Sequence, residues 1–290
     1  MREPDFRYAD VFGLQMAYLE SGSGDPIVLL HGNPTSSYLW RRVVPFLAPL
    51  GRVLAPDLLG MGRSDKLPSP GPESYRFAEH RRYLGRLLEF LGVEERVVLV
   101  GHDWGGALAF DWARRHPDAV RGIAHMEAIV GPRSWSEVSD ELRGFLQRLR
   151  SPEGEDLVLR DNTFVERLPA VTFELTDADL AAYRAPYLEP GESRRPTLTW
   201  PRELPFEGEP EAVHADATAW SQWMATSAVP KLLVRAEPGA IVTGSVLERC
   251  RKWPNQKEVS VRARHFVPQD AGDDVGRAVA DWIAELPTGP

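Results

Sequence analysis

Cysteine, long apolar runs and clustered basic residues are scarce in this sequence of 290 residues. Cys250 is the single cysteine, so no intramolecular disulfide can form, which is typical of proteins from a reducing compartment. No run of about 18 apolar residues occurs, so we expect no membrane-spanning helix. Acidic and basic residues are interspersed and give a net charge of −8, which argues against binding to nucleic acid.

The sequence also lacks internal repeats, low-complexity segments and the apolar stretch of a signal peptide near its start, so we expect a cytoplasmic protein. Hydrophobic residues make up 43% of the chain and charged residues 26%, as in ordinary globular proteins. A chain of this length buries a core large enough to be stable without a disulfide or a metal ion. We therefore expect no structural metal.

Short apolar runs recur along the chain, separated by helical patterns. The runs lie at residues 27–30, 53–55, 97–100, 122–126 and 232–234, with a weaker one at 259–261. Runs this short and apolar predict parallel strands that are buried on both faces. A hairpin is expected at residues 10–14, and an amphipathic helix near residues 84–91, ended by Gly92. The alternation predicts an α/β protein with a doubly wound, mostly parallel sheet.

The alternation breaks between residues 131 and 216. A helical stripe is formed by Val138, Leu142, Phe145, Leu146 and Leu149. Residues 176–179 have the form of a capping box that opens a short helix ending before Pro186. We expect a helical cap at residues 131–216, inserted into a core made of residues 1–130 and 217–290.

The segment Gly101-His102-Asp103-Trp104-Gly105 follows one apolar run and precedes a helix. It has the form glycine, any residue, nucleophile, any residue, glycine, which marks a sharp strand-to-helix turn. Such a turn exposes the central side chain above the sheet edge, and glycines are needed because larger side chains would clash. The helix N-terminus offers positive potential to a carboxylate. We predict that Asp103 is a nucleophile.

A second loop, His31-Gly32-Asn33-Pro34, follows the first apolar run. In folds with such an elbow, this loop supplies one backbone N–H of an oxyanion hole, and the residue after the nucleophile supplies the other. The pattern therefore predicts that the backbone N–H groups of Asn33 and Trp104 form the hole. His31 is expected to be structural.

A general base is expected late in the chain, after the last strand. His265 is the one histidine in that position. An acid must orient it, and two glutamates compete: Glu127 follows the strand at 122–126, and Glu237 follows the strand at 232–234. The motifs alone do not choose between them.

With these motifs in place, the sequence resembles the haloalkane dehalogenases of the α/β-hydrolase superfamily over nearly its whole length. The matching segments are HGNPTSSYLWR at 31–41, DLLGMGRSD at 57–65, GHDWGGALAFDWA at 101–113, HMEAIVGP at 125–132, DNTFVERLP at 161–169, AEPGAIV at 236–242 and HFVPQD at 265–270. The resemblance implies the α/β-hydrolase fold: a mostly parallel eight-stranded sheet, helices on both faces, and an inserted helical cap.

The resemblance also implies roles for individual residues. Asn33 and Trp104 are expected to bind halide through their side-chain N–H groups, and Glu127 rather than Glu237 is expected to support His265. Four residues match apolar positions near the family's site: Phe145, Phe164, Ile241 and Phe266. We expect them to line the substrate pocket, although plain core packing explains them equally well.

The implied reaction is hydrolytic dehalogenation, in which a small apolar haloalkane becomes an alcohol, a halide ion and a proton through an ester on Asp103. It needs neither a metal nor an organic cofactor. We expect a monomer or a small homo-oligomer, with no nucleic-acid or membrane partner. Arg264 departs from the family, where a small or apolar residue is commoner. A cation there is expected to lower the pKa of the base or to crowd the pocket mouth.

Three other functions fit parts of the pattern. An epoxide hydrolase also uses an aspartate at the elbow, with cap tyrosines as proton donors, for which Tyr183 and Tyr187 are candidates. Its oxyanion loop usually carries an aromatic residue where this chain has Asn33. A coelenterazine-type luciferase shares the same set of site residues. A binding protein on this scaffold often lacks a catalytic residue, whereas this chain has the full set.

Overall fold

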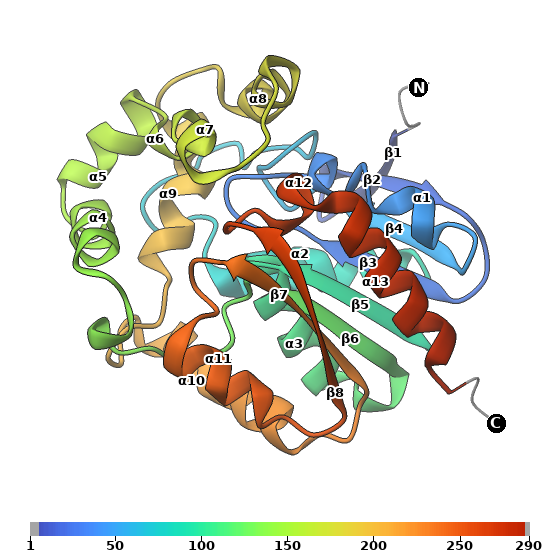
Figure 1. Ribbon diagram of the computed structural model, residues 1–290. Coiled ribbons are helices and arrows are strands. Elements are labelled where there is room, and N and C mark those ends of the chain that lie inside the picture. The colour runs from blue at the N-terminus through green and yellow to red at the C-terminus, as the bar shows by residue number, and fades with distance from the viewer. Residues whose placement is uncertain (1–5, 288–290) are drawn as a thin grey trace.

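The sheet is the scaffold on which the rest of the chain is arranged (Figure 1). The computed structural model describes residues 6–287, and within them one eight-stranded sheet has the order β1-β2-β4-β3-β5-β6-β7-β8. The strands are β1 Phe6–Val11, β2 Leu14–Ser21, β3 Pro26–Leu30, β4 Arg52–Pro56, β5 Val97–His102, β6 Val120–Met126, β7 Lys231–Pro238 and β8 Gln256–Ala263. Strands β3 to β8 are parallel, and the β1–β2 hairpin joins them through the antiparallel pair of β2 and β4.

The predicted strands and the hairpin are confirmed. Strand β8 gives the weakest apolar pattern because it forms one edge of the sheet, where Gln256–Ala263 is mostly exposed. Strand β5 lies at the centre and is buried along its whole length. A buried parallel strand therefore leaves a continuous apolar run in the sequence, and an edge strand does not.

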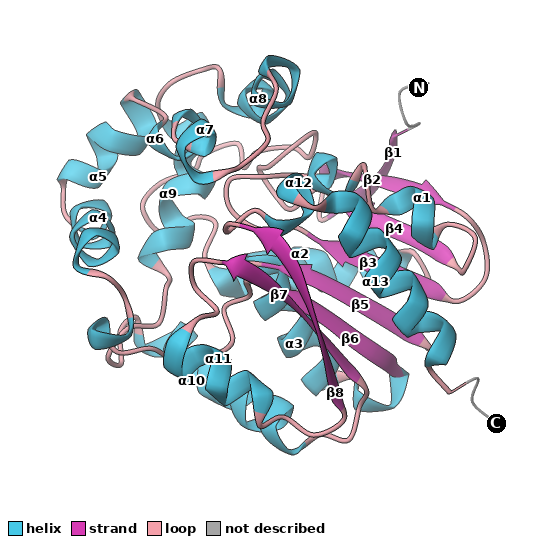
Figure 2. Ribbon diagram, viewed as in Figure 1, coloured by secondary structure: helices cyan, strands magenta, loops and turns pink. Residues whose placement is uncertain are grey.

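Helices cover both faces of the sheet (Figures 1 and 2). One face packs against α1 and α13, and the other against α2, α3, α10 and α11. These helices and the short α12 have the bounds α1 Val44–Leu47, α2 Phe77–Phe90, α3 Trp104–Arg115, α10 Glu211–Thr226, α11 Gly244–Arg251, α12 Val267–Asp270 and α13 Gly272–Glu285. Among residues 6–287, no helix combines the length and the apolar character needed to cross a bilayer.

The cap helices lie between β6 and β7, as predicted, above the carboxyl ends of the strands (Figure 1). They are α4 Asp140–Arg150, α5 Glu153–Glu155, α6 Thr163–Glu166, α7 Leu168–Val171, α8 Asp177–Arg184 and α9 Arg195–Arg202. The capping box before α8 is present. Val138, the first residue of the predicted stripe, lies outside the helix. The Ser139 hydroxyl accepts the N–H of Leu142, so α4 begins only at Asp140.

The boundary between cap and core remains a proposal. Helix α10, Glu211–Thr226, continues through the expected boundary at residue 216 and packs against α3 of the core. A boundary next to Pro210, the residue that precedes α10, would keep that helix whole.

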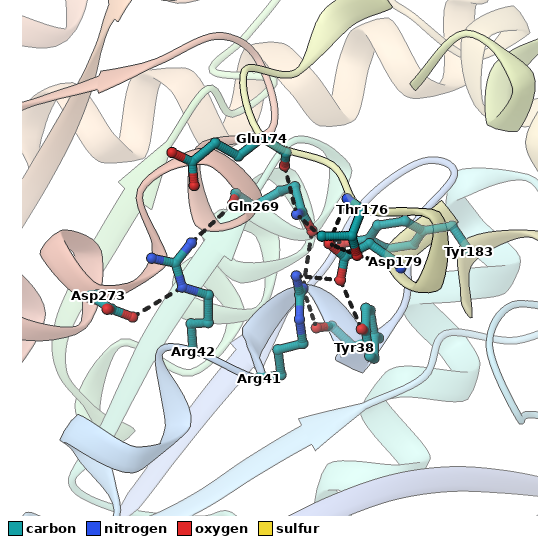
Figure 3. A network of polar contacts seen from close by, with 9 residues as sticks. All are labelled: Tyr38, Arg41, Arg42, Glu174, Thr176, Asp179, Tyr183, Gln269 and Asp273. Atoms are coloured by element: carbon teal, nitrogen blue, oxygen red, sulfur yellow. Dashed lines mark hydrogen bonds and ion pairs between the residues drawn. The ribbon is translucent and has the colours of Figure 1, made fainter. Parts of the chain in front are cut away.

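A buried polar network joins α8 of the cap to the core (Figure 3). The carboxylate of Asp179 accepts hydrogen bonds from the Tyr38 hydroxyl at 2.8 Å and from Arg41 at 2.7 Å. Gln269, four residues after His265, accepts from Arg41 at 3.0 Å and from the Tyr183 hydroxyl at 3.0 Å. Its amide donates to the carbonyl of Glu174 at 2.9 Å. The position of the cap is therefore coupled to the loop that carries His265.

This network predicts the effect of removing Asp179. We expect Asp179→Ala to lower the free energy of unfolding by about 2–4 kcal/mol, because it leaves Arg41 and Tyr38 without their acceptor. Asp177→Ala removes an exposed acid in the first turn of the same helix and should cost less than about 0.5 kcal/mol. Urea unfolding followed by circular dichroism measures both. Equal losses would mean that the network adds no stability of its own.

Candidate active site

Asp103 lies at the sharp turn between β5 and α3, with a φ of 54°. A Cβ atom at Gly105 would overlap the carbonyl oxygen of Leu30, which explains why this position of the turn requires glycine. The Asp103 carboxylate is buried, and its Oδ1 accepts the backbone N–H of Asn33 at 2.9 Å. The turn therefore holds a buried carboxylate directly at the predicted oxyanion loop.

The structure brings His265 between Asp103 and Glu127. The Nε2 atom of His265 is 3.6 Å from Oδ2 of Asp103, and its Nδ1 is 3.2 Å from Oε2 of Glu127. Glu237, the other candidate acid, is half exposed and forms an ion pair with Arg235 at 3.0 Å. The geometry thus places Glu127, and not Glu237, behind the imidazole.

Backbone groups fix the carboxylate of Glu127. Its Oε2 accepts the N–H groups of Ala240 at 3.0 Å and Ile241 at 2.8 Å, and its Oε1 accepts that of Val242 at 3.1 Å. Glu127 also has a positive φ of 44°, which is unfavourable for a side chain of this kind. The AEPGAI segment therefore holds the acid with its backbone.

The two carboxylates control the ionisation of His265. Burial disfavours its charged form, but hydrogen bonds and charges from Asp103 and Glu127 outweigh burial and raise the pKa of His265 to about 10. The expected lowering of this pKa by Arg264 is therefore not what the structure shows. Burial likewise works against the charged form of Asp103, yet the contact with His265 dominates and lowers the pKa of that carboxyl.

A proline inside α9 leaves a backbone carbonyl free to accept a hydrogen bond from the side chain of Asn33. Pro201 has no N–H to donate to the carbonyl of Thr197, four residues earlier. That carbonyl instead accepts Nδ2 of Asn33 at 3.2 Å. A primary amide has two N–H bonds, so the side chain of Asn33 keeps a second donor. Asn33 also lines the cavity described below.

The indole of Trp104 is held in a stack of aromatic side chains. It stacks on Trp200 of α9 at a centroid distance of 4.7 Å and meets Phe77 of α2 at 5.9 Å. Trp200 donates its own indole N–H to the sulfur of Met61 at 3.4 Å. Cap and core thus fix the orientation of Trp104 together.

An apolar cavity of about 390 Å³ lies between the cap and the carboxyl ends of the strands. The predicted site residues Asn33, Asp103, Trp104 and His265 line it, and so do the four predicted pocket residues, Phe145, Phe164, Ile241 and Phe266. Arg264 lines it as well, in agreement with a place near the pocket mouth. Both tyrosines considered as epoxide-opening acids lie elsewhere: Tyr183 is bonded to Gln269, and Tyr187 is fully buried.

Sequence reasoning missed the part played by His102, which it treated as a turn residue. The Nε2 atom of His102 lies 2.8 Å from the carbonyl oxygen of His265 and holds the loop that carries the imidazole. The position of His102, directly before Asp103 at the end of β5, was the available signal. His31 is structural in the way expected, since its ring bridges the carbonyl of Gly32 and the N–H of Leu58.

Comparison with known proteins identifies relatives of this arrangement. A family model described as alpha/beta hydrolase fold matches residues 25–274. A haloalkane dehalogenase from Sphingobium indicum is 51% identical over 97% of this chain and 95% of its own length. Another from Mycolicibacterium smegmatis is 47% identical over 98% of this chain and 92% of its own length.

A solved structure agrees with the sequence comparison. The crystal structure of a haloalkane dehalogenase from Bradyrhizobium elkani superposes with a TM-score of 0.90, at 41% identity over 97% of each chain. Similarity at this level spans both the core and the cap. The chain therefore belongs to the haloalkane dehalogenases, a family with the α/β-hydrolase fold.

Proposed function

We propose that this protein hydrolyses the carbon–halogen bond of haloalkanes, with Asp103 as nucleophile, His265 as base and Glu127 as the acid that orients the base. The observation that carries the proposal is the line of Glu127, His265 and Asp103 at the end of an apolar cavity. An ionised carboxylate that faces an apolar cavity is suited to attack carbon, because little water competes for its lone pairs.

The first step uses the two oxygens of Asp103 differently. Oδ2 attacks the carbon that bears the halogen, while Oδ1 stays on the N–H of Asn33 and becomes the carbonyl oxygen of the ester. The carbon–halogen bond breaks, and the halogen leaves with the bonding electrons. The second amide N–H of Asn33 and the indole N–H of Trp104 bind the developing halide, and this interaction is stronger in the transition state than with neutral substrate.

The second step needs a base that is neutral. Ester formation removes the negative charge of Asp103, which lies 3.6 Å from Nε2, so the pKa of His265 falls and the imidazole releases its proton. Neutral His265 then takes a proton from water, and the hydroxide attacks the ester carbonyl. The backbone N–H groups of Asn33 and Trp104 stabilise the oxyanion, and the alcohol leaves with Asp103 and protonated His265 restored.

The wider setting is part of the same proposal. We place the enzyme in the cytoplasm as a monomer or small homo-oligomer that has no nucleic-acid partner. The single cysteine fits a reducing compartment, and the net charge of −8 disfavours phosphate backbones.

Replacement of the nucleophile tests the reaction most directly. We expect the wild type to release halide from 1,2-dibromoethane and 1-bromobutane, and Asp103→Ala to release none above the uncatalysed rate. Asp140→Ala, which changes an exposed acid on the cap, should match the wild type. If the wild type released no halide either, the proposal would be withdrawn. Assays with styrene oxide and coelenterazine would then test the epoxide hydrolase and luciferase activities.

Replacement of the base separates the two steps. His265→Ala retains the nucleophile, so we expect it to release one equivalent of halide and then stop with the alkyl group bound to Asp103. Mass spectrometry of the intact protein after reaction with 1-iodohexane measures the added group. Normal turnover by this variant would exclude His265 as the base.

The timing of proton release follows from the charges around His265. At a pH of about 8, the imidazole of the free enzyme is protonated, since its pKa is raised to about 10. In a single turnover with a pH indicator, we expect the proton to appear together with the halide, before the alcohol. His265→Ala should release halide without a proton in that phase. A proton that appears only with ester hydrolysis would mean that His265 is neutral in the free enzyme.

A further inference from the structure

The charges that line the cavity do not balance. Three arginines, Arg133, Arg167 and Arg264, line a cavity whose only lining carboxylate among the described residues is Asp103. The protein as a whole has the opposite imbalance, with a net charge of −8. Arg167 is exposed and Arg264 is half-buried, so these two cations lie where the cavity meets the solvent.

Two of these arginines converge on one turn of the cap. The guanidinium of Arg264 donates to the carbonyl of Ala170 at 2.6 Å. The N–H of Ala170 in turn donates to the carbonyl of Arg167 at 2.9 Å. Both side chains also lie over aromatic rings, Arg167 over Phe145 at 4.5 Å and Arg264 over Phe173 at 4.8 Å. Arg264 is thereby tied to the cap turn at residues 167–170, which also carries Arg167, and both side chains line the cavity.

Neither guanidinium has a carboxylate within 4.0 Å among residues 6–287, although acids lie near both. Glu166 is paired with Arg184, and Asp270 accepts the backbone N–H groups of Phe173 and Arg264. Several other cap arginines are paired with a carboxylate; Arg160, for example, contacts Asp156 at 2.9 Å. An anionic group in the cavity would supply the carboxylate partner that both guanidinium groups lack.

We propose that Arg167 and Arg264 form an anion subsite for the carboxylate end of substrates that carry the halogen at their other end. The class is that of ω-halogenated carboxylates, with an apolar chain that crosses the cavity to Asp103. Guanidinium groups suit this role because they bind carboxylates through paired hydrogen bonds. The inference rests on the proposed dehalogenase function and adds a substrate class to it. Arg133 is left out, because the negative charge of Glu137 already acts on its guanidinium, which also donates to the carbonyl of that residue.

The test compares matched substrates on the whole enzyme. Halide release is measured for bromoalkanoates from 4-bromobutanoate to 8-bromooctanoate and for the neutral amide of each. We expect one chain length at which kcat/KM for the carboxylate exceeds that for the amide by about two- to fivefold, as for a partly exposed ion pair. Raising the salt concentration to about 0.5 M should reduce this preference through screening.

Variants assign the preference to the two residues. In Arg167→Met and Arg264→Met, we expect the ratio of kcat/KM for the carboxylate to kcat/KM for the amide to fall to about one. Methionine retains the apolar stem and loses the charge. Arg167→Lys should keep part of the preference. The ratio is taken within each variant, so a general loss of folding or chemistry cancels. Arg160→Met removes an exposed cap arginine that does not line the cavity and should leave the wild-type ratio.

The possible outcomes distinguish a failure of the anion subsite from a failure of the proposed dehalogenase function. If bromide were released from 1-bromohexane but kcat/KM for no carboxylate exceeded that for its amide, the anion subsite would be wrong. The proposed dehalogenase function would still stand. An unchanged ratio in Arg167→Met and Arg264→Met would overturn the subsite as well. Absence of halide from every substrate, including 1-bromohexane, would instead overturn the proposed function.

Discussion

The site depends on burying two carboxylates around one imidazole. Asp103 and Glu127 are both almost inaccessible to solvent, and unpaired charges at such depth would be very costly. His265 lies between them, and backbone N–H groups donate to both carboxylates, one to Asp103 and three to Glu127. The fold must therefore bring five separate segments to the carboxyl ends of neighbouring strands. The parallel sheet does this, because those ends share one edge.

Strain is concentrated at the same place. Asp103 and Glu127 both have positive φ, and each such residue costs on the order of 1–3 kcal/mol. The hydrogen bonds to the carboxylates of Asp103 and Glu127 help to hold both residues in these backbone conformations. Pro201 acts in a related way, since the hydrogen bond that α9 loses becomes the anchor of Asn33. Local departures from regular structure thus place the side chains on which the proposed chemistry depends.

Local sequence patterns predicted the core strands and the elbow and singled out Asp103 and His265 as candidates, because each leaves a signal within a few positions. Buried parallel strands appear as apolar runs, and the elbow requires its glycines. The choice of Glu127 over Glu237 came from the family resemblance, since both follow a strand and only tertiary contacts distinguish them. The position of His102 beside Asp103 was a signal, but its partner was not predictable, nor was the contact of Asn33 with the carbonyl of Thr197. Contacts between distant segments leave no local pattern.

Core and cap differ in how they hold the site. The core fixes Asp103 and Glu127 mainly through backbone N–H groups, which do not depend on the identity of neighbouring side chains. The cap instead contributes side chains, among them Phe145, Phe164 and Arg167, that can change without disturbing those bonds. Substrate preference can therefore vary through the cap while the chemistry stays constant. The proposed anion subsite of Arg167 and Arg264 is a feature of this kind, since it would add a class of substrate and leave the reacting groups in place.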